Sequence, residues 1–496
     1  MIQTDVELIS ELSPMQQAML FASLYAPGSG VYVVQLSLRL TGRLDAAAFE
    51  RAWRRVVERH DALRTGFHWE DLEKPIQVVL GGVDLGIRRE SWLGSSREEQ
   101  EARLREHMET DREAGFALSE PPLMRLALFE LAPNEWHLVW SLHHLLVDGW
   151  SVGLLLRELF TCYAAFAAGR EPSLPPPRSY GDYISWLQRQ DAAEAEAFWR
   201  RSLAGISGPT LIAGGDGREA AGFRQTRRQS VRLGTEETAG LRELARRHRL
   251  TLNTLVQGAW SLVLAQATGG GEVVFGGTVA GRPGDLPGAD TIVGLFINTL
   301  PVRVAVDPEG RVLPWLAEIQ ERQSEARRYE HAPLFEIQTW SGLPAGTALF
   351  DNILVFESYP LDGSLAALVP DLSMSRLTVN EQTNYPLNLV VVPGSELSLE
   401  VLCDSQRFDA PAAVRLLERL TGVLQVFAAD PQRRVGEVPL LLEGERHQLL
   451  VEWNDTVAGF PREASLPALF AAVAAAMPEA PAVVEGEEVW SYRRLA

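Results

Sequence analysis

Residues 142–151 constrain the fold of this chain most, because they bring the end of a strand, a tight turn and the start of a helix together. Residues 136–142 are rich in aromatic and branched side chains, a composition typical of a strand. Residues 150–168 carry apolar side chains at helical spacing and are followed by a glycine, which predicts an amphipathic helix. The sequence therefore predicts a strand–turn–helix unit with Asp148 and Gly149 at its turn.

Two adjacent histidines, His143 and His144, stand at the end of the predicted strand. Because successive side chains of a strand face opposite sides, we expect only one of them to enter a given cleft. Taken singly, these residues have ordinary structural explanations: a buried histidine packs in a core, Asp148 caps a helix, and Gly149 permits an unusual backbone angle. Taken together, they form the pattern HHxxxDG.

HHxxxDG is the third core motif of the condensation domains of nonribosomal peptide synthetases, and the chain resembles that family from about Leu8 to Leu450. The seventh motif is the weakest match, because family members read RDxSRNPL where this chain reads NEQTNYPL, without either arginine. The other stretches similar to core motifs are LSPMQQAMLF at residues 12–21, RHDALRTGF at 59–67, YGDYISW at 180–186, VGLFINTLPVR at 293–303 and YEHAPLFE at 329–336.

The expected fold is α/β. Strands and helices in the first part of the chain predict a lobe around a mixed sheet, and the resemblance implies two chloramphenicol-acetyltransferase-like lobes in a V with a tunnel between them. The proline-rich residues 171–178 cannot continue a helix or enter a sheet interior. We therefore expect an N-terminal lobe over residues 1–172 and a C-terminal lobe over residues 173–450.

The end of the chain differs in character. Residues 451–464 resemble the linker that follows condensation domains, and residues 465–496 resemble the start of an adenylation domain, with its opening motif at residues 491–495. About thirty residues cannot bury a core of their own. We therefore expect the chain to be a piece of a longer synthetase, cut just inside its next domain.

The resemblance implies amide bond formation between two carrier-bound substrates. An upstream, donor peptidyl carrier protein presents an aminoacyl or peptidyl thioester, and the amine on a downstream, acceptor carrier attacks it. The expected partners are these two carriers and the adjoining adenylation domain. No cofactor is expected on this chain itself, since 4'-phosphopantetheine is carried by the partner carriers. The LSPMQ variant resembles members that take an L-configured donor.

The resemblance also assigns roles to residues. His144 is expected to orient the amine, and the resemblance leaves two roles open for it: a base that takes the amine's proton, or a group that acts by positioning alone. The Gly149 N–H is expected to steady the thioester oxygen. Asp148 is expected to be structural, paired with Arg282. The remaining assignments are His143 as structural, Ser151 and Asn298 as tunnel-lining candidates, and His60 and Arg64 as structural rather than catalytic.

Other functions share this fold. An epimerization domain keeps HHxxxDG, but the expected adenylation start argues against it. A non-catalytic module that recruits a partner tends to lose the second histidine or the glycine, and this chain keeps both. A heterocyclization domain would have aspartates in place of His143 and His144, and a free acyltransferase that uses coenzyme A would not lead into an adenylation domain.

Composition limits the remaining possibilities. The 496 residues carry a net charge of -19, which argues against general binding of nucleic acid. The two cysteines form no metal-ligand spacing and no disulfide framework, and we expect no metal site. No leader or bilayer-spanning run is apparent, so we expect a cytoplasmic protein without membrane contact.

Overall fold

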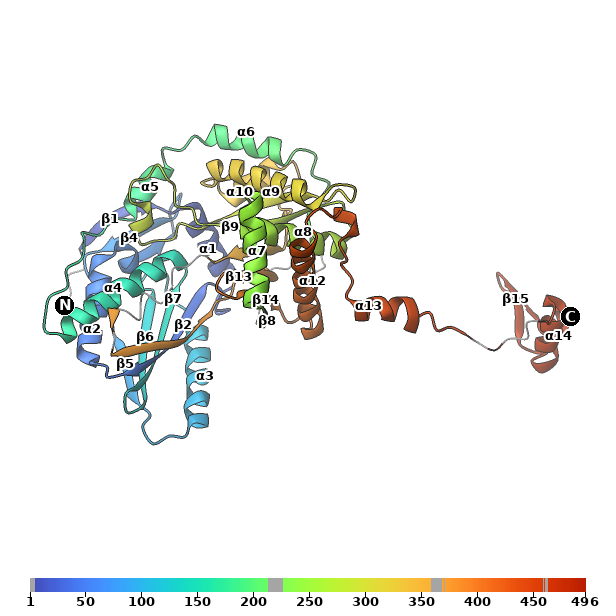
Figure 1. The fold of residues 1–496 in the computed structure, drawn as a ribbon, viewed down its shortest axis with the longest axis horizontal. Helices are drawn as coiled ribbons and strands as arrows, with labels where there is room; N and C mark the ends of the chain where they lie inside the picture. Colours follow the sequence, from blue (N-terminus) through green and yellow to red (C-terminus); the bar gives the residue numbers. More distant parts are fainter. Residues whose placement is uncertain (1–4, 213–225, 358–367, 370, 458, 460–462) are drawn as a thin grey trace. The chain divides into compact units, whose positions relative to one another are not determined.

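The predicted strand–turn–helix unit consists of strand β7 (Glu135–His143) and helix α4 (Gly149–Ala167) (Figure 1). Strand β7 lies in the middle of a five-stranded sheet of order β12-β2-β7-β6-β5, in which only β5 and β6 run parallel. This confirms the mixed sheet predicted for the first part of the chain. The computed structural model describes residues 5–212, 226–357, 368–369, 371–457, 459 and 463–496.

Helices cover both faces of this sheet because its strands alternate between two apolar sets of side chains. One set packs with helices α2 and α4 in a large core, and the other packs in a smaller cluster with helix α3. A separate sheet of order β1-β4-β3 lies beside them. The elements of this part are β1 (Val6–Glu11), α1 (Pro14–Tyr25), β2 (Val33–Gly42), α2 (Ala46–Arg59), β3 (Thr65–His68), β4 (Ile76–Leu80), β5 (Ile87–Ser91), α3 (Arg97–Ala114) and β6 (Met124–Ala132).

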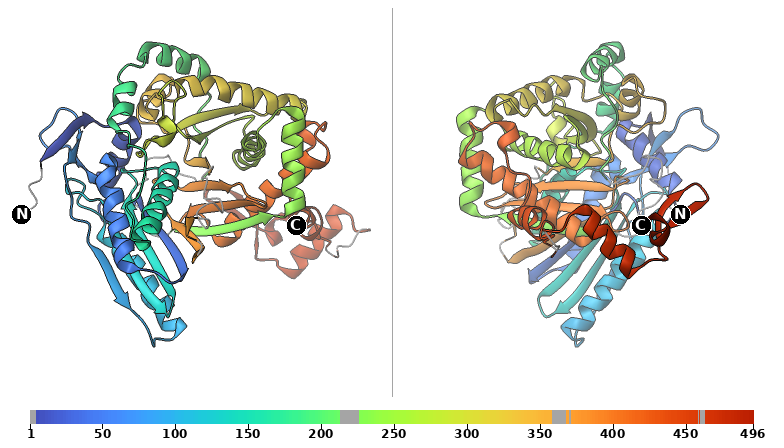
Figure 2. Two further views of the ribbon diagram at one scale, coloured as in Figure 1. Left: turned by 60° about the vertical axis from the view of Figure 1, so that its left-hand side comes forward. Right: turned by 90° about the vertical axis from the view of Figure 1, so that its right-hand side faces the viewer.

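The second part of the chain builds a six-stranded sheet of order β10-β9-β11-β13-β14-β8 (Figure 2). Helices α7, α8, α9 and α12 pack with one face of it in a second core. The opposite face carries many polar side chains. The elements are α5 (Gly181–Leu187), α6 (Ala192–Ser202), β8 (Thr226–Leu233), α7 (Thr235–His248), α8 (Leu252–Thr268), β9 (Glu272–Val279), β10 (Asn298–Ala305), α9 (Val312–Ala326), α10 (Leu334–Trp340), β11 (Asn352–Phe356), β13 (Leu387–Val392), β14 (Leu397–Asp404) and α12 (Ala410–Ala429).

Strand β12 (Leu372–Asn380) departs from this division of the chain. It comes from the second part of the sequence, but it pairs antiparallel with β2 at the edge of the five-stranded sheet, from Leu372 opposite Gly42 to Asn380 opposite Gln35. The large core of the first part also contains Val293, Leu295, Val369 and Leu372. The two halves of the sequence are thus joined through a shared sheet and a shared core.

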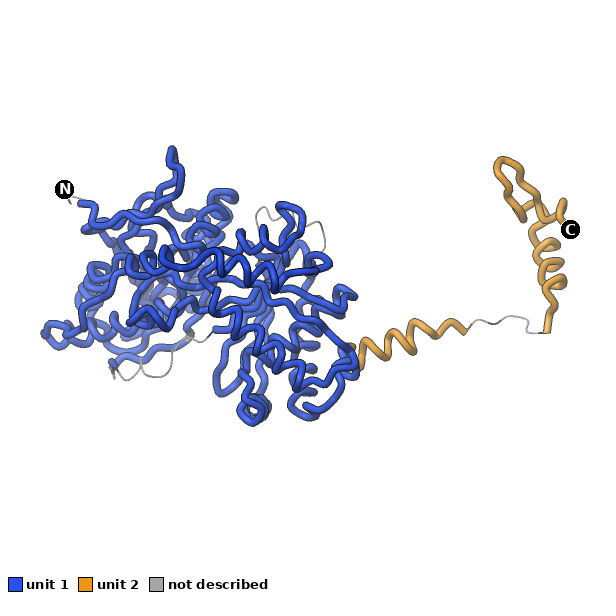
Figure 3. The backbone as a smooth tube through the Cα atoms, turned by 90° about the horizontal axis from the view of Figure 1, so that it is seen from above, with its two compact units in different colours: residues 1–440 blue, residues 441–496 orange. Residues whose placement is uncertain are grey.

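The chain divides into two compact units, residues 1–440 and residues 441–496 (Figure 3). The second unit contains one apolar helix, α14, and an antiparallel hairpin of β15 and β16. None of the helices among the described residues is long and apolar enough to cross a membrane. The elements of the second unit are α13 (Glu443–His447), α14 (Leu466–Ala476), β15 (Pro481–Glu485), β16 (Glu488–Ser491) and α15 (Tyr492–Leu495).

Candidate functional site

The two histidines at the end of β7 face different surroundings, as their alternation predicts. His143 is buried, with its Nε2 atom 3.2 Å from Ser23 Oγ and its ring edge-on to Phe116. Burial and the neighbouring His144 lower the pKa of His143 to about 3, so its ring is neutral at physiological pH. His144 instead lines a cavity of about 1010 Å³.

The cavity extends over the polar face of the six-stranded sheet. Because side chains alternate along a strand, one set from strands β11 and β13 enters the core beneath the helices and the other set borders the cavity. Strand β13 shows this clearly: Asn388, Val390 and Val392 line the cavity, whereas Leu389 and Val391 are fully buried in the core. The wall is completed by helix α1, the segment 381–385, His144 and Gly149.

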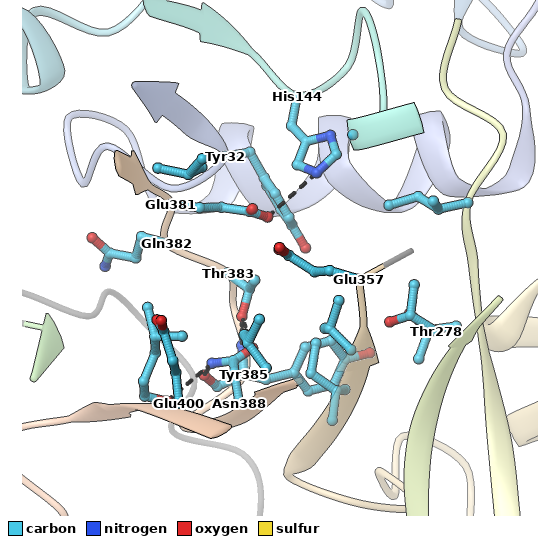
Figure 4. A pocket seen from close by; sticks show the side chains of 18 of the residues that line it. Tyr32, His144, Thr278, Glu357, Glu381, Gln382, Thr383, Tyr385, Asn388 and Glu400 are labelled. Atoms are coloured by element: carbon cyan, nitrogen blue, oxygen red, sulfur yellow. Dashed lines mark hydrogen bonds and ion pairs between the residues drawn. The ribbon is translucent and has the colours of Figure 1, made fainter. Parts of the chain in front are cut away.

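Within the cavity, the His144 imidazole meets the carboxylate of Glu381 (Figure 4). The Nε2 atom of His144 lies 3.3 Å from Glu381 Oε1. Burial by itself would lower the pKa of His144, but the charge of Glu381 and its hydrogen bond outweigh burial and raise that pKa. Burial would likewise raise the pKa of Glu381, but the contact with His144 lowers it. Each group therefore favours the charged form of the other.

Tyr32 holds both members of this pair in place. Its carbonyl oxygen accepts a 2.8 Å hydrogen bond from the His144 N–H, and its own N–H donates to the carbonyl of Gln382 at 2.9 Å. Its hydroxyl donates to Asn384 Oδ1 at 2.6 Å. Tyr32 adopts φ of 60°, a conformation rare for a bulky residue. Such strain persists where surrounding contacts over-determine it, and it is common at functional sites.

The turn after His144 is fixed by Asp148, which caps α4 by accepting the Ser151 N–H at 2.8 Å. Its other carboxylate oxygen accepts the N–H of Phe296 at 3.0 Å, and Arg282 Nη2 lies 3.2 Å from Oδ1. The side chain of Asp148 is 0% exposed and that of Arg282 is 6% exposed. The structure thus brings together the two residues that the resemblance pairs, and Gly149 begins the helix beside them.

Ser151 and Asn298, the two candidates for lining the tunnel, occupy different positions. Ser151 is fully buried, donates to the carbonyl of Gly294 at 2.8 Å and accepts from Arg282 at 2.8 Å. It belongs to the contact around Asp148 and is not part of the cavity wall among the described residues. Asn298 does line the cavity, and its amide nitrogen donates to the carbonyls of Glu330 and Ala332, both at 2.8 Å.

His60 and Arg64 lie in structural contacts, apart from the cavity wall described here. His60 Nε2 lies 2.9 Å from Glu158 Oε2, and Arg64 pairs with Glu7 at 2.8 Å and donates to the carbonyl of Leu80. Both side chains are buried. Because a buried arginine needs partners for its charge, these contacts account for its place in the motif.

Sequence reasoning did not single out Glu381 or Tyr32. A signal for Glu381 is present, because it stands where the seventh family motif, RDxSRNPL, has its acidic residue. The absence of both arginines from that motif obscures this retained acidic position. Nothing comparable marks Tyr32, whose role rests on backbone contacts that leave no pattern in the sequence.

Residues 6–450 match the family model described as "Condensation domain". The chain belongs to the condensation domain family. It is 44% identical over 491 residues to one of the subunits of linear gramicidin synthase from Brevibacillus parabrevis, an alignment that covers 99% of this chain and 10% of that protein. The chain thus spans about a tenth of the length of this curated relative. Condensation domains of nonribosomal peptide synthetases catalyse amide bond formation, an acyl transfer.

Solved structures share the fold of this chain. The first condensation domain of the calcium-dependent antibiotic synthetase superposes with a TM-score of 0.74 at 22% identity, over 88% of this chain and 100% of that one. The X-domain from teicoplanin biosynthesis superposes with a TM-score of 0.73 at 28% identity, over 87% and 97%. The predicted two-lobed, chloramphenicol-acetyltransferase-like α/β fold is thereby confirmed.

Proposed function

We propose that this condensation domain joins an acceptor amine to a donor acyl group, each delivered as a thioester on the phosphopantetheine arm of a peptidyl carrier protein. The observation that carries this proposal is that His144 and Gly149, the reactive positions of HHxxxDG, border one cavity. The cavity's volume of about 1010 Å³ suits the ends of two arms, since sites for one small molecule span ~300–1,000 Å³.

In the proposed reaction the acceptor nitrogen forms a bond to the thioester carbonyl carbon. The C–S bond then breaks, with its electron pair on the sulfur of the upstream arm. One amine proton passes through His144 Nε2 to that sulfur, which leaves as a thiol. The lengthened chain remains on the downstream carrier.

Two effects supply most of the rate in this proposal. Holding the acceptor amine and the donor thioester in attack geometry makes their reaction effectively unimolecular. Such positioning corresponds to effective molarities of ~10⁵ M or more in good cases. A positioned base such as His144 typically adds ~10²–10⁴-fold. Gly149 begins α4, so its N–H lies at the positive end of the helix and suits the developing oxyanion. Asp148 and Arg282 contribute by fixing the turn that carries both groups.

The test loads a donor peptide on one carrier and an amino acid on a second, and follows the mass of both by intact-protein mass spectrometry. We expect the wild-type chain to move the peptide mass to the downstream carrier. We expect His144→Ala to slow this transfer by ~10²-fold or more, as loss of a positioned base does. His60→Ala removes a buried histidine from outside the cavity wall and serves as the matched control.

Two other results would reject amide formation. Exchange of the donor's α-proton without transfer would indicate an epimerization domain. Stable binding of a partner protein without transfer would indicate a recruiting module.

We also infer that residues 465–496 open an adenylation domain and that residues 451–464 form the linker to it. The helix α14 and the β15–β16 hairpin support this, since the residues that resemble the start of an adenylation domain are folded into regular elements. The similarity to the linear gramicidin synthase relative runs through 99% of the chain and so includes this region. Extending the chain with an adenylation domain and finding that it activates an amino acid with ATP would test the inference.

A further inference from the structure

The carboxylate of Glu381 occupies the part of the cavity where the acceptor amine must meet His144. Figure 4 shows the His144 ring pointing into the cavity, with its Nε2 atom toward Glu381. The side chain of Glu381 is 29% exposed, so it borders the open space of the cavity and is not sealed in the core. An amine that approaches Nε2 therefore also comes within reach of the Glu381 oxygens.

The placement of Glu381 is fixed by the surrounding chain. The segment that follows it is tied to Tyr32 through the carbonyl of Gln382 and the side chain of Asn384, and Tyr32 also holds the His144 backbone. Thr383 adds a 2.7 Å hydrogen bond to Asn388 on strand β13. One set of contacts thus fixes both the histidine and the carboxylate.

The chemistry of the acceptor calls for two such groups. An α-amino group has a pKa near ~7.7–8.0 in model peptides, so much of the acceptor reaches the cavity as an ammonium at pH 7. A neutral imidazole can accept one hydrogen bond from this cation, but it carries no negative charge to attract it. A carboxylate beside it adds a second acceptor and the opposite charge.

We propose that Glu381 is a positioning residue that receives the α-ammonium of the acceptor beside His144 and holds the ring ready to take its proton. This inference rests on the proposed amide-forming function. No bond is made or broken beyond those of that reaction. One proton reaches the leaving sulfur through His144, and the extra proton of the ammonium leaves to water along the exposed side of Glu381.

The direction of the pKa shifts agrees with this role. The Glu381 charge favours the protonated form of His144, so its removal lowers the pKa of His144. Because a proton acceptor must be neutral, activity then begins at a lower pH. The titratable or charged groups near the ring, over all neighbouring segments, are Tyr32, His143, Asp148, Arg228, Glu357, Glu381 and Tyr385.

The experiment measures the pH dependence of carrier-to-carrier transfer for wild type, Glu381→Gln and Glu381→Asp. For Glu381→Gln we expect the acid limb of kcat to move ~1 pH unit lower, since an opposite charge within ~4–6 Å shifts a pKa by ~1–3 units. We also expect the KM for the acceptor carrier to rise ~10-fold with that for the donor unchanged, because the acceptor ammonium loses its charge-assisted hydrogen bond to the carboxylate. Glu381→Asp should restore the position of the acid limb.

The chain provides a matched control in Glu158→Gln, which disrupts another carboxylate–histidine contact, 2.9 Å from Glu158 Oε2 to His60 Nε2. That contact lies outside the cavity wall, so its loss should leave the acid limb in place. An NMR titration of labelled histidine, with the His144 signal assigned from His144→Ala, gives a second measurement independent of turnover. It should show a lower His144 pKa in Glu381→Gln.

The outcomes separate this role from the proposed function. Transfer by Glu381→Gln with an unchanged acid limb and an unchanged acceptor KM would overturn the role of Glu381 and leave amide formation intact. A His144 titration that does not move would also overturn it. Absence of transfer by the wild-type chain would refute the proposed function, and this inference with it.

Discussion

Asp148 shows how much one buried side chain can hold together. Its carboxylate caps α4, accepts the N–H of Phe296 and pairs with Arg282. Asp148→Ala leaves the Arg282 charge buried without this partner, and breaking a buried ion pair costs ~3–5 kcal/mol. We expect the free energy of unfolding, measured by urea denaturation, to fall by about that amount. The transfer rate should fall with it, because the turn that carries His144 and Gly149 loses its anchor.

A second helix cap separates the effect of the ion pair from that of capping. Asp45 caps α2 through the N–H groups of Ala47 and Ala48, is exposed, and forms no ion pair within the described residues. Asp45→Ala should therefore cost only ~0.5–2 kcal/mol. Equal losses for the two variants would show that Asp148 acts as a cap alone.

Among single residues, the sequence predicts the site residues that lie close to one another along the chain. His143, His144, Asp148 and Gly149 lie within a few positions of one another, so strand alternation and helix capping place them relative to the backbone. Glu381 reaches the same site through pairing of distant strands and through contacts with Tyr32. Such contacts depend on the tertiary fold and leave no local pattern to detect.

Among the elements, the loop between β9 and β10 carries Arg282 to the start of α4, and Gly281 determines its path. Gly281 has φ of 61°, and an added Cβ would lie 1.8 Å from the carbonyl oxygen of Phe296. We expect Gly281→Ala to be strongly destabilising, since the left-handed conformation alone costs ~1–2 kcal/mol for a residue with a Cβ and the backbone contact adds to this. Thermal unfolding should show a clear drop in Tm.

The same loop contains a control for this substitution. Gly284 has no positive φ, and a Cβ there would meet nothing within 4 Å. Gly284→Ala should therefore leave Tm close to that of the wild-type chain. Similar Tm values for the two alanine variants would mean that the path of the loop does not depend on Gly281.

Most elements follow from periodicity and end signals. Helices α1, α2 and α3 begin at residues whose types mark helix starts in the sequence: Ser13 before Pro14, Asp45, and Ser96 with Glu99 as a capping box. Strand β5 lies in a stretch without apparent pattern, because it is short, lies at a sheet edge and has no buried residue. Edge strands receive fewer packing constraints, so their sequences carry a weaker signal.

At the scale of the whole molecule, strand β12 joins the two halves of the sequence. It comes from the second half and pairs with β2 in the sheet of the first half. Strand β2 would otherwise present a long edge with mostly buried side chains, and β12 covers it. Exposed edges of this kind promote aggregation. The lobe boundary proposed at residues 172 and 173 thus divides the sequence, while the sheet of the first lobe still depends on residues 372–380.

This dependence predicts the behaviour of a fragment. A chain of residues 1–172 lacks β12, lacks Leu372 and three further apolar residues of the large core, and leaves Asp148 without Arg282. We expect it to elute as aggregates in size-exclusion chromatography and to show no cooperative urea transition. Fusing residues 371–380 to its end through a flexible linker should raise the monomeric fraction, whereas a scrambled version of that strand should not. A monomeric, cooperatively unfolding fragment 1–172 would show that the first lobe folds without the borrowed strand.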